Sequence, residues 1–139
     1  MDEGSRTFDH TGDLRLEVWA GDAARLYALA AESLMARVAD ARGAAATLER
    51  HLRLDGDDPA DLLVHWLNTV LLESELARAV WTRAEVCRLT PTSLEATLRG
   101  SPLDPARQTF LREIKAVSQH GLTLELDGPV CRCRLVLDV

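Results

Sequence analysis

The chain has 139 residues, 47% of them hydrophobic and 27% charged, which is typical of one ordinary globular domain with its own core. Its formal net charge of −6 disfavours a protein that holds nucleic acid by the phosphates alone, so we expect no stable direct nucleic-acid binding. No apolar run approaches the length of a membrane span, and the acidic, polar start is unlike a secretory signal, so we expect a cytoplasmic protein without membrane contact.

The first predicted elements are a strand and an amphipathic helix. Apolar and polar residues alternate over residues 14–20, after a glycine-containing turn, which predicts a half-buried strand. Apolar residues then recur at spacings of three and four over residues 23–40, and this period predicts a helix with one buried face. Asp22 stands just before the helix and is its expected N-cap.

A second strand and a second helix follow. Residues 45–54 alternate in the same way, and the DGDDP turn leads into an apolar-rich stretch over residues 59–77. Asp58 is the expected cap of this helix, and Pro59 lies in the first turn, where proline is favoured. The apolar stripe is wide, so we expect this helix to be the central packing element.

The rest of the chain is typical of strands, broken by a loop over residues 100–109 that contains glycine and proline. The predicted strands cover residues 79–89, 93–99, 114–118, 122–126 and 130–139. The order β-α-β-α-β-β-β-β-β predicts a single α+β domain over residues 1–139. We expect a two-layer sandwich, with two helices packed on a mostly antiparallel β-sheet.

Acidic residues mark two places suited to a divalent cation. Asp9, His10 and Asp13 surround a Thr-Gly turn, where oxygen ligands and a tight backbone suit a hard cation. Aspartates also favour turns for their own local hydrogen bonds, which is the alternative interpretation. Asp138 and the Val139 carboxylate place two negative charges at the end of the final strand. A cation would turn their repulsion into attraction; a solvated strand end is the alternative.

Lys115 is the only lysine in a chain whose other basic residues are all arginine. Lysine and arginine differ in geometry, pKa and nucleophilic capacity, so a retained lysine is a candidate contact to a phosphate or a carboxylate. The alternative is an exposed lysine that survives by chance.

Cys131 and Cys133 share one face of the final strand. No further soft ligands stand at zinc spacing, so we expect both thiols to be buried and inert. The sequence also lacks a P-loop, a nucleophile elbow, a dinucleotide fingerprint and a helical histidine pair, and it outlines no enzyme active site.

Three stretches in combination resemble one family. FDHTGDLRLEVWA, DLLVHWLNTVLLESE, and EIKAVSQHGLTLE followed by LVLDV are similar to archease, a small protein that works with the RtcB-type RNA ligase in tRNA splicing and RNA repair. The similarity runs from Phe8 to Val139 in the order and spacing of the family. A departure lies in AVSQH, where Ser118 and Gln119 replace the threonine and tyrosine that are usual in the family.

The resemblance implies a two-layer α+β fold and a protein that is not an enzyme by itself. It implies an activator that assists guanylylation of the ligase and allows its multiple turnover. It also implies a divalent metal site, for Ca²⁺ or alternatively Mg²⁺ or Mn²⁺, formed by Asp13, Asp138 and the Val139 carboxylate. Lys115 falls on the family lysine that is connected with activation.

Two other functions stay open. A metal-dependent phosphoesterase would use the same acidic residues, with His10 and His120 as the candidate bases. If the protein is an activator, these two histidines are candidates for a place beside the metal ligands. A chaperone-like module for RNA-modifying proteins would instead show an exposed apolar surface and would tolerate the loss of Lys115.

Overall fold

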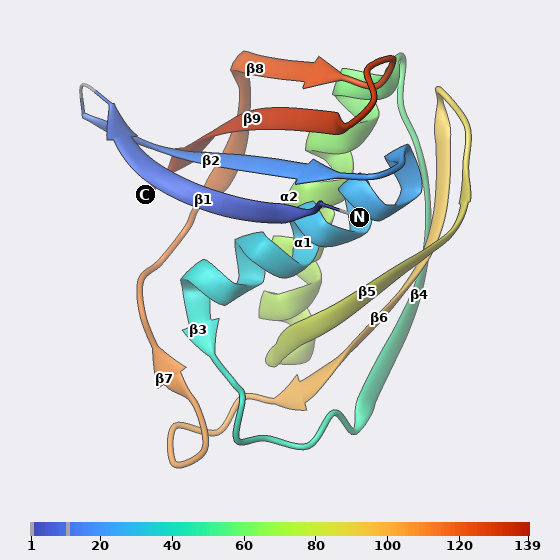
Figure 1. The fold of residues 1–139 in the computed structure, drawn as a ribbon. Helices are drawn as coiled ribbons and strands as arrows, with labels where there is room; N and C mark the ends of the chain where they lie inside the picture. Colours follow the sequence, from blue (N-terminus) through green and yellow to red (C-terminus); the bar gives the residue numbers. More distant parts are fainter. Residues whose placement is uncertain (1, 11) are drawn as a thin grey trace.

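A computed structural model describes residues 2–10 and 12–139, without the side chain of His10, and within these residues the strands form two main antiparallel sheets and one short pair (Figure 1). The first sheet has the order β1-β2-β9-β8, formed respectively by Gly4–His10, Asp13–Ala20, Cys131–Asp138 and Ala116–Glu125. The second has the order β4-β6-β5, formed by Leu48–Asp55, Ser93–Pro102 and Ala79–Leu89. The short pair joins β3 (Ala39–Asp40) to β7 (Thr109–Phe110).

Helices α1 (Ala23–Val38) and α2 (Pro59–Ala77) each contact strands of both main sheets. In Figure 1 they occupy the middle of the molecule, with the first sheet at the top and the second at the right. Both predicted N-caps are confirmed, because Asp22 and Asp58 each accept a hydrogen bond of 2.8 Å from a backbone N–H three residues on. No helix in the described part of the chain is long and apolar enough to cross a membrane.

The core lies where the inner faces of the sheets meet the helices. Leu14 and Leu16 of β2 are buried on this face, and alternate residues of the strand belong to the outer face. Two aromatic residues join the helices at the centre. The Tyr27 hydroxyl donates to the Pro59 carbonyl (2.6 Å), and the Trp66 indole N–H donates to the Tyr27 carbonyl (2.8 Å).

The outer face of the first sheet is held together by Glu17. Its side chain is only 5% exposed and accepts hydrogen bonds from Arg6 on β1 (2.9 Å) and Arg134 on β9 (2.9 Å). The hydrogen bond from Arg134 is the main cause that lowers the pKa of the Glu17 carboxyl. Both guanidinium groups also lie over the ring of Phe8, at 5.9 and 5.4 Å from its centroid. Glu17 therefore links three neighbouring strands.

The predicted fold class is confirmed, since two helices pack against antiparallel sheets. The prediction missed β1, because its sequence GSRTFDH has no alternation of apolar and polar residues. A strand at the edge of a sheet can form with few buried apolar side chains. It also divided β8 in two, at residues 114–118 and 122–126. The structure has one strand whose ladder is irregular between Ser118 and Thr123, and Gly121, with a φ of 81°, bends the backbone there without ending the strand.

The cysteines of the final strand are buried, as predicted. Cys131 and Cys133 both lie on the inner face of β9. Burial raises the pKa of the Cys133 thiol to about 12 and also raises the pKa of Cys131. Both thiols are therefore protonated at neutral pH, and neither has the thiolate character that a reactive or metal-binding cysteine needs.

Candidate metal and activation site

The two acidic strand ends predicted from the sequence lie at the same edge of the first sheet. β2 begins at Asp13 and β9 ends at Asp138, and the two strands are antiparallel neighbours with Leu14 opposite Leu137. The paired register ends there, and continuing it by one residue would place Asp13 opposite Asp138. Figure 1 shows the end of β1, the start of β2 and the C-terminus on the same side of the molecule. Like charges opposed across a ladder repel each other, so this edge favours a bound cation.

The alternation of the strands separates Asp9 from this edge. Leu14 and Leu137 are buried on the inner face, so Asp13 and Asp138 belong to the outer face of the sheet. Asp9 pairs with Leu14 and therefore belongs to the inner-face set. His10 pairs with Asp13 across the hairpin, but its side chain lies outside the described residues. Of the first acidic group, Asp13 is the residue that the fold places beside Asp138.

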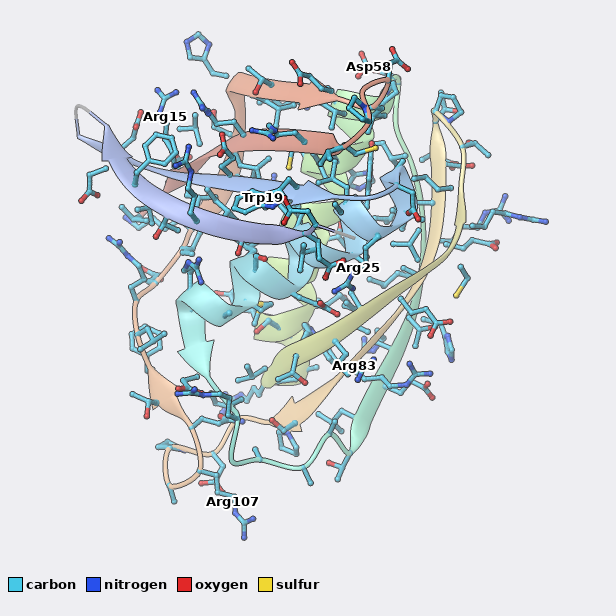
Figure 2. All side chains as sticks on the ribbon, in the orientation of Figure 1. Arg15, Trp19, Arg25, Asp58, Arg83 and Arg107 are labelled. Atoms are coloured by element: carbon cyan, nitrogen blue, oxygen red, sulfur yellow. The ribbon has the colours of Figure 1, made fainter. Side chains whose placement is uncertain are left out.

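Arg15 is a neighbour of this edge that the sequence analysis did not single out. Its Nε lies 3.2 Å from Oδ1 of Asp13, in an ion pair whose side chains are 22% and 36% exposed. Figure 2 shows Arg15 close to the hairpin end of β2. The spacing of two residues in a strand was the available signal, because it places both side chains on one face. The ion pair occupies Oδ1 of Asp13, and no residue that the structure describes donates a hydrogen bond to Oδ2.

The backbone of Lys115 is bonded directly to this edge. Its N–H donates to the carbonyl oxygen of Asp138 (2.7 Å), and the next residue, Ala116, pairs with Asp138 in the β8–β9 ladder. Ile114 on the other side is buried. The backbone of Lys115 is therefore fixed, while its side chain is exposed and makes no ion pair with any described residue.

Asn68 of α2 holds the strand that follows Lys115, and the sequence analysis had assigned it no role. Its side-chain amide donates to the Val117 carbonyl (3.0 Å) and accepts from the Val117 N–H (2.8 Å), like a short extra strand. Val117 is buried and Asn68 is half-buried, so both hydrogen bonds are partly shielded from water. A polar residue inside an apolar helix stripe was the signal that could have revealed it.

Lys115 is one of the residues that line a large pocket. This pocket, of about 1020 Å³, lies between the ends of α1 and α2 and residues 103–115. We call it the apolar groove; its walls include Met35, Leu71, Leu72, Leu103, Phe110 and Lys115. Lys115 thus lines the groove and has its backbone bonded to the acidic edge, so it connects the two features.

His120 lies at the irregular part of β8, four residues beyond Ala116. It is exposed, and its backbone N–H donates to the Ser118 hydroxyl (3.0 Å). No described hydrogen bond joins His120 to Asp13 or Asp138. Its place beside metal ligands stays a prediction.

The donor set at the acidic edge suits a hard divalent cation in its chemistry. Asp13 and Asp138 offer carboxylate oxygens on adjacent strands, and the Val139 carboxylate follows directly. Among the side chains that the structure describes, no group of three or more His, Cys, Asp or Glu could hold a metal ion. A complete site at this edge therefore needs the backbone carboxylate, His10 or a partner's oxygen in addition to the two aspartates.

The fold and this edge define a class of small α+β domains that present carboxylates and a lysine at one end of a four-stranded sheet. The chain belongs to one such family: the model of the Archease protein family (MTH1598/TM1083) matches residues 6–139.

Relatives and solved structures agree with this assignment. A protein archease of Methanopyrus kandleri is 29% identical over 134 residues, covering 94% of this chain and 96% of the relative. One of Methanosarcina mazei is 25% identical over 135 residues, covering 94% and 92%. The solution structure of protein 1598 of Methanobacterium thermoautotrophicum has a TM-score of 0.79 at 20% identity, covering 98% and 99%. The crystal structure of an archease of Thermotoga maritima, described as a possible chaperone, has a TM-score of 0.64 at 22% identity, covering 96% of each chain.

Proposed function

We propose that this protein is a non-catalytic, metal-binding cofactor of an RtcB-type RNA ligase in the cytoplasm. It promotes guanylylation of the ligase and multiple turnover in tRNA splicing or RNA repair. The pairing of β2 with β9 carries the proposal, because it sets Asp13 and Asp138 at one edge and brings the Lys115 backbone to the same place. Membership of the archease family supports the same partner.

The residues have separate roles in this proposal. Asp13, Asp138 and the Val139 carboxylate hold the ion, which we expect to be Ca²⁺, with Mg²⁺ and Mn²⁺ as alternatives. A bound ion supplies positive charge that offsets the electrostatic repulsion among three neighbouring carboxylates. The acidic edge complements a ligase cleft that must bind GTP, metals and RNA ends, and such complementarity speeds encounter and fixes orientation. Lys115 contacts a phosphate or a ligase carboxylate.

A ligase turnover assay tests the activator role. Wild-type protein should raise the number of ligations per ligase molecule, and Lys115→Ala should lower that maximum at saturating concentration. Arg112→Ala removes an exposed cation from the same segment and is the matched control. No stimulation by the wild-type protein would contradict the proposed function itself.

Calorimetry tests the metal site independently of the ligase. Asp13→Asn and Asp138→Asn should each weaken Ca²⁺ binding by at least about tenfold, because each removes one charged ligand from a small, partly exposed site. Residues added after Val139 should weaken it similarly. Asp104→Asn, at the opposite end of the 103–115 segment from Lys115, should leave the affinity unchanged. Equal affinities in wild type and both ligand variants would refute the assignment of these ligands.

The chaperone-like module is a second candidate, because the apolar groove exposes the kind of surface that it requires. The two functions differ in their response to Lys115→Ala. A chaperone that holds apolar segments should still suppress aggregation of an unfolded client with this substitution, whereas a ligase activator should lose most of its stimulation. Measuring both activities on the same variant separates them.

A further inference from the structure

Exposed apolar residues gather around one part of the molecule. Apart from Val139, every large hydrophobic residue that is exposed in the described part of the chain lies on the second half of α2 or between residues 103 and 111. These residues are Leu72, Leu76, Leu103, Phe110 and Leu111. Figure 1 shows β7 and the segment after it on the same side as the C-terminus. Three of them, Leu72, Leu103 and Phe110, line the apolar groove. Scattered single apolar residues need no explanation, but exposed apolar residues gathered in a groove indicate a binding surface.

The apolar groove is already formed in the free protein. The 103–115 segment that builds one wall is fastened to three elements by backbone hydrogen bonds. Leu103 donates to the Arg78 carbonyl at the end of α2 (2.8 Å), and Leu111 donates to the Val38 carbonyl at the end of α1 (2.9 Å). Lys115 donates to Asp138 at the end of β9 (2.7 Å). A partner therefore does not have to order this wall when it binds, which favours affinity.

The uncharged polar side chains of Asn68, Ser74 and Gln108, which line the groove, already have hydrogen-bond partners. Gln108 is buried and donates to the Ser101 hydroxyl and the Pro102 carbonyl, both at 2.9 Å. Asn68 holds Val117, as described above. A ligand in the groove gains few hydrogen bonds from these side chains, so the groove favours ligands with apolar side chains.

The rim of the apolar groove carries charges of both signs. Glu75, Arg78, Glu113 and Lys115 all line it, and none of them forms an ion pair with another residue that the structure describes. A fatty acid, which has one charged head group, would pair with the basic residues only. A peptide segment with apolar side chains for the groove and both acidic and basic flanking residues would pair with the basic and the acidic residues alike. An amphipathic helix has this composition and fits an apolar groove through residues spaced three and four apart.

We propose that the apolar groove binds an amphipathic helix of the RNA ligase that this protein activates. This inference rests on the proposed function and adds the surface by which the two proteins meet. Lys115 provides the continuity: it is one of the residues that line the groove, and its backbone is bonded to the acidic edge through Asp138. A ligase helix bound in the groove would bring both Lys115 and the carboxylates of the acidic edge close to the ligase.

Charge substitutions in the groove test this docking. Leu72 is 50% exposed and Phe110 is 67% exposed, so Leu72→Glu and Phe110→Glu remove little core packing. Thr92→Glu adds the same charge at the exposed β5–β6 turn and is the matched control. Thermal unfolding of each variant checks the fold. The measurement is the concentration of each variant that gives half-maximal stimulation of the RtcB-type ligase from the same organism.

We expect the two groove variants to raise this concentration at least about 30-fold, as loss of a central apolar anchor does, and to reach the wild-type maximum at saturation. The control should match the wild type. Unchanged half-maximal concentrations in folded groove variants, while the wild type still stimulates, would overturn the docking proposal and leave the proposed function intact. Failure of the wild type to stimulate would instead remove the proposed function.

A cross-linking experiment identifies the occupant. Benzoylphenylalanine in place of Phe110 should cross-link, under light, to one face of a ligase helix. Cross-linking to the RNA or to a second copy of this chain would overturn the proposal. So would cross-linking to an unfolded client that competes with the ligase.

Discussion

The amide of Asn68 replaces a neighbouring strand for β8, and its removal should be costly. The substitution Asn68→Ala deletes both hydrogen bonds to Val117, at 2.8 and 3.0 Å. Leaving a buried donor or acceptor unsatisfied costs about 1–3 kcal/mol each. Val117 is only 3% exposed, but the half-buried position of Asn68 lets water recover part of this cost. We therefore expect a loss of about 2–4 kcal/mol of unfolding free energy, or roughly 10 °C in Tm.

Chemical denaturation followed by circular dichroism measures this loss, and hydrogen exchange localises it. The Val117 amide should be protected in the wild type and should exchange much faster in Asn68→Ala than the amides of β4. Thr69→Ala is the matched control, because the Thr69 hydroxyl only donates to the His65 carbonyl of its own helix (2.7 Å). Its effect should stay within about 0.5 kcal/mol.

A functional consequence follows, since Val117 lies two residues after Lys115. Under conditions where Asn68→Ala remains folded, the variant should stimulate the ligase less than Thr69→Ala does. Wild-type stability of Asn68→Ala, together with an unchanged exchange rate at Val117, would refute the view that this amide holds the strand.

Three further outcomes are expected. Arg15→Gln should tighten Ca²⁺ binding about two- to fivefold in calorimetry, because the partly exposed ion pair with Asp13 competes with the ion; weaker binding would mean that Arg15 supports the site. Glu17→Gln should cost about 1–2 kcal/mol at pH 7. The pKa of Glu17 is lowered in the fold, so its contribution to the free energy of unfolding is complete above pH 4.5, the ordinary pKa of the carboxyl. This contribution is lost as the pH falls through the lowered pKa, so the denaturation curves of wild type and variant should converge at low pH. Gly100→Ala should cost about 2–3 kcal/mol or more, since its Cβ would overlap the Val80 carbonyl on β5; a wild-type Tm would contradict this close approach.

Much of the fold follows from local patterns in the sequence. The alternation in β2 and the period of α1 and α2 predicted these elements because each buries a complete face. Asp22 and Asp58 were identifiable because an N-cap depends on nearby residues only. β1 was not predicted, because an edge strand such as GSRTFDH is held by backbone pairing and by Glu17, with little apolar burial of its own.

The candidate site was less accessible to sequence reasoning. The pattern placed Asp13 and Asp138 at strand ends, and the structure makes those strands neighbours, which is a non-local fact. The position of Lys115 between the acidic edge and the apolar groove depends on the 103–115 segment. That segment is fastened by hydrogen bonds at separate points and has no period of its own. The spacing of Asp13 and Arg15 indicated that their side chains share a face, but charge alone does not show which neighbour a side chain pairs with.

The position of β9 has a consequence for how the protein is made. This strand comes last in the chain, yet it lies between β2 and β8 in the middle of the first sheet. During synthesis, more than a hundred residues separate the β1–β2 hairpin from its partner strand β9, so the sheet closes late and through long-range contacts, which fold slowly. A chain that stops before residue 131 loses the central strand and the acidic edge together. Truncated products should therefore be unfolded and cleared by proteases, and they should not compete with intact protein for the ligase.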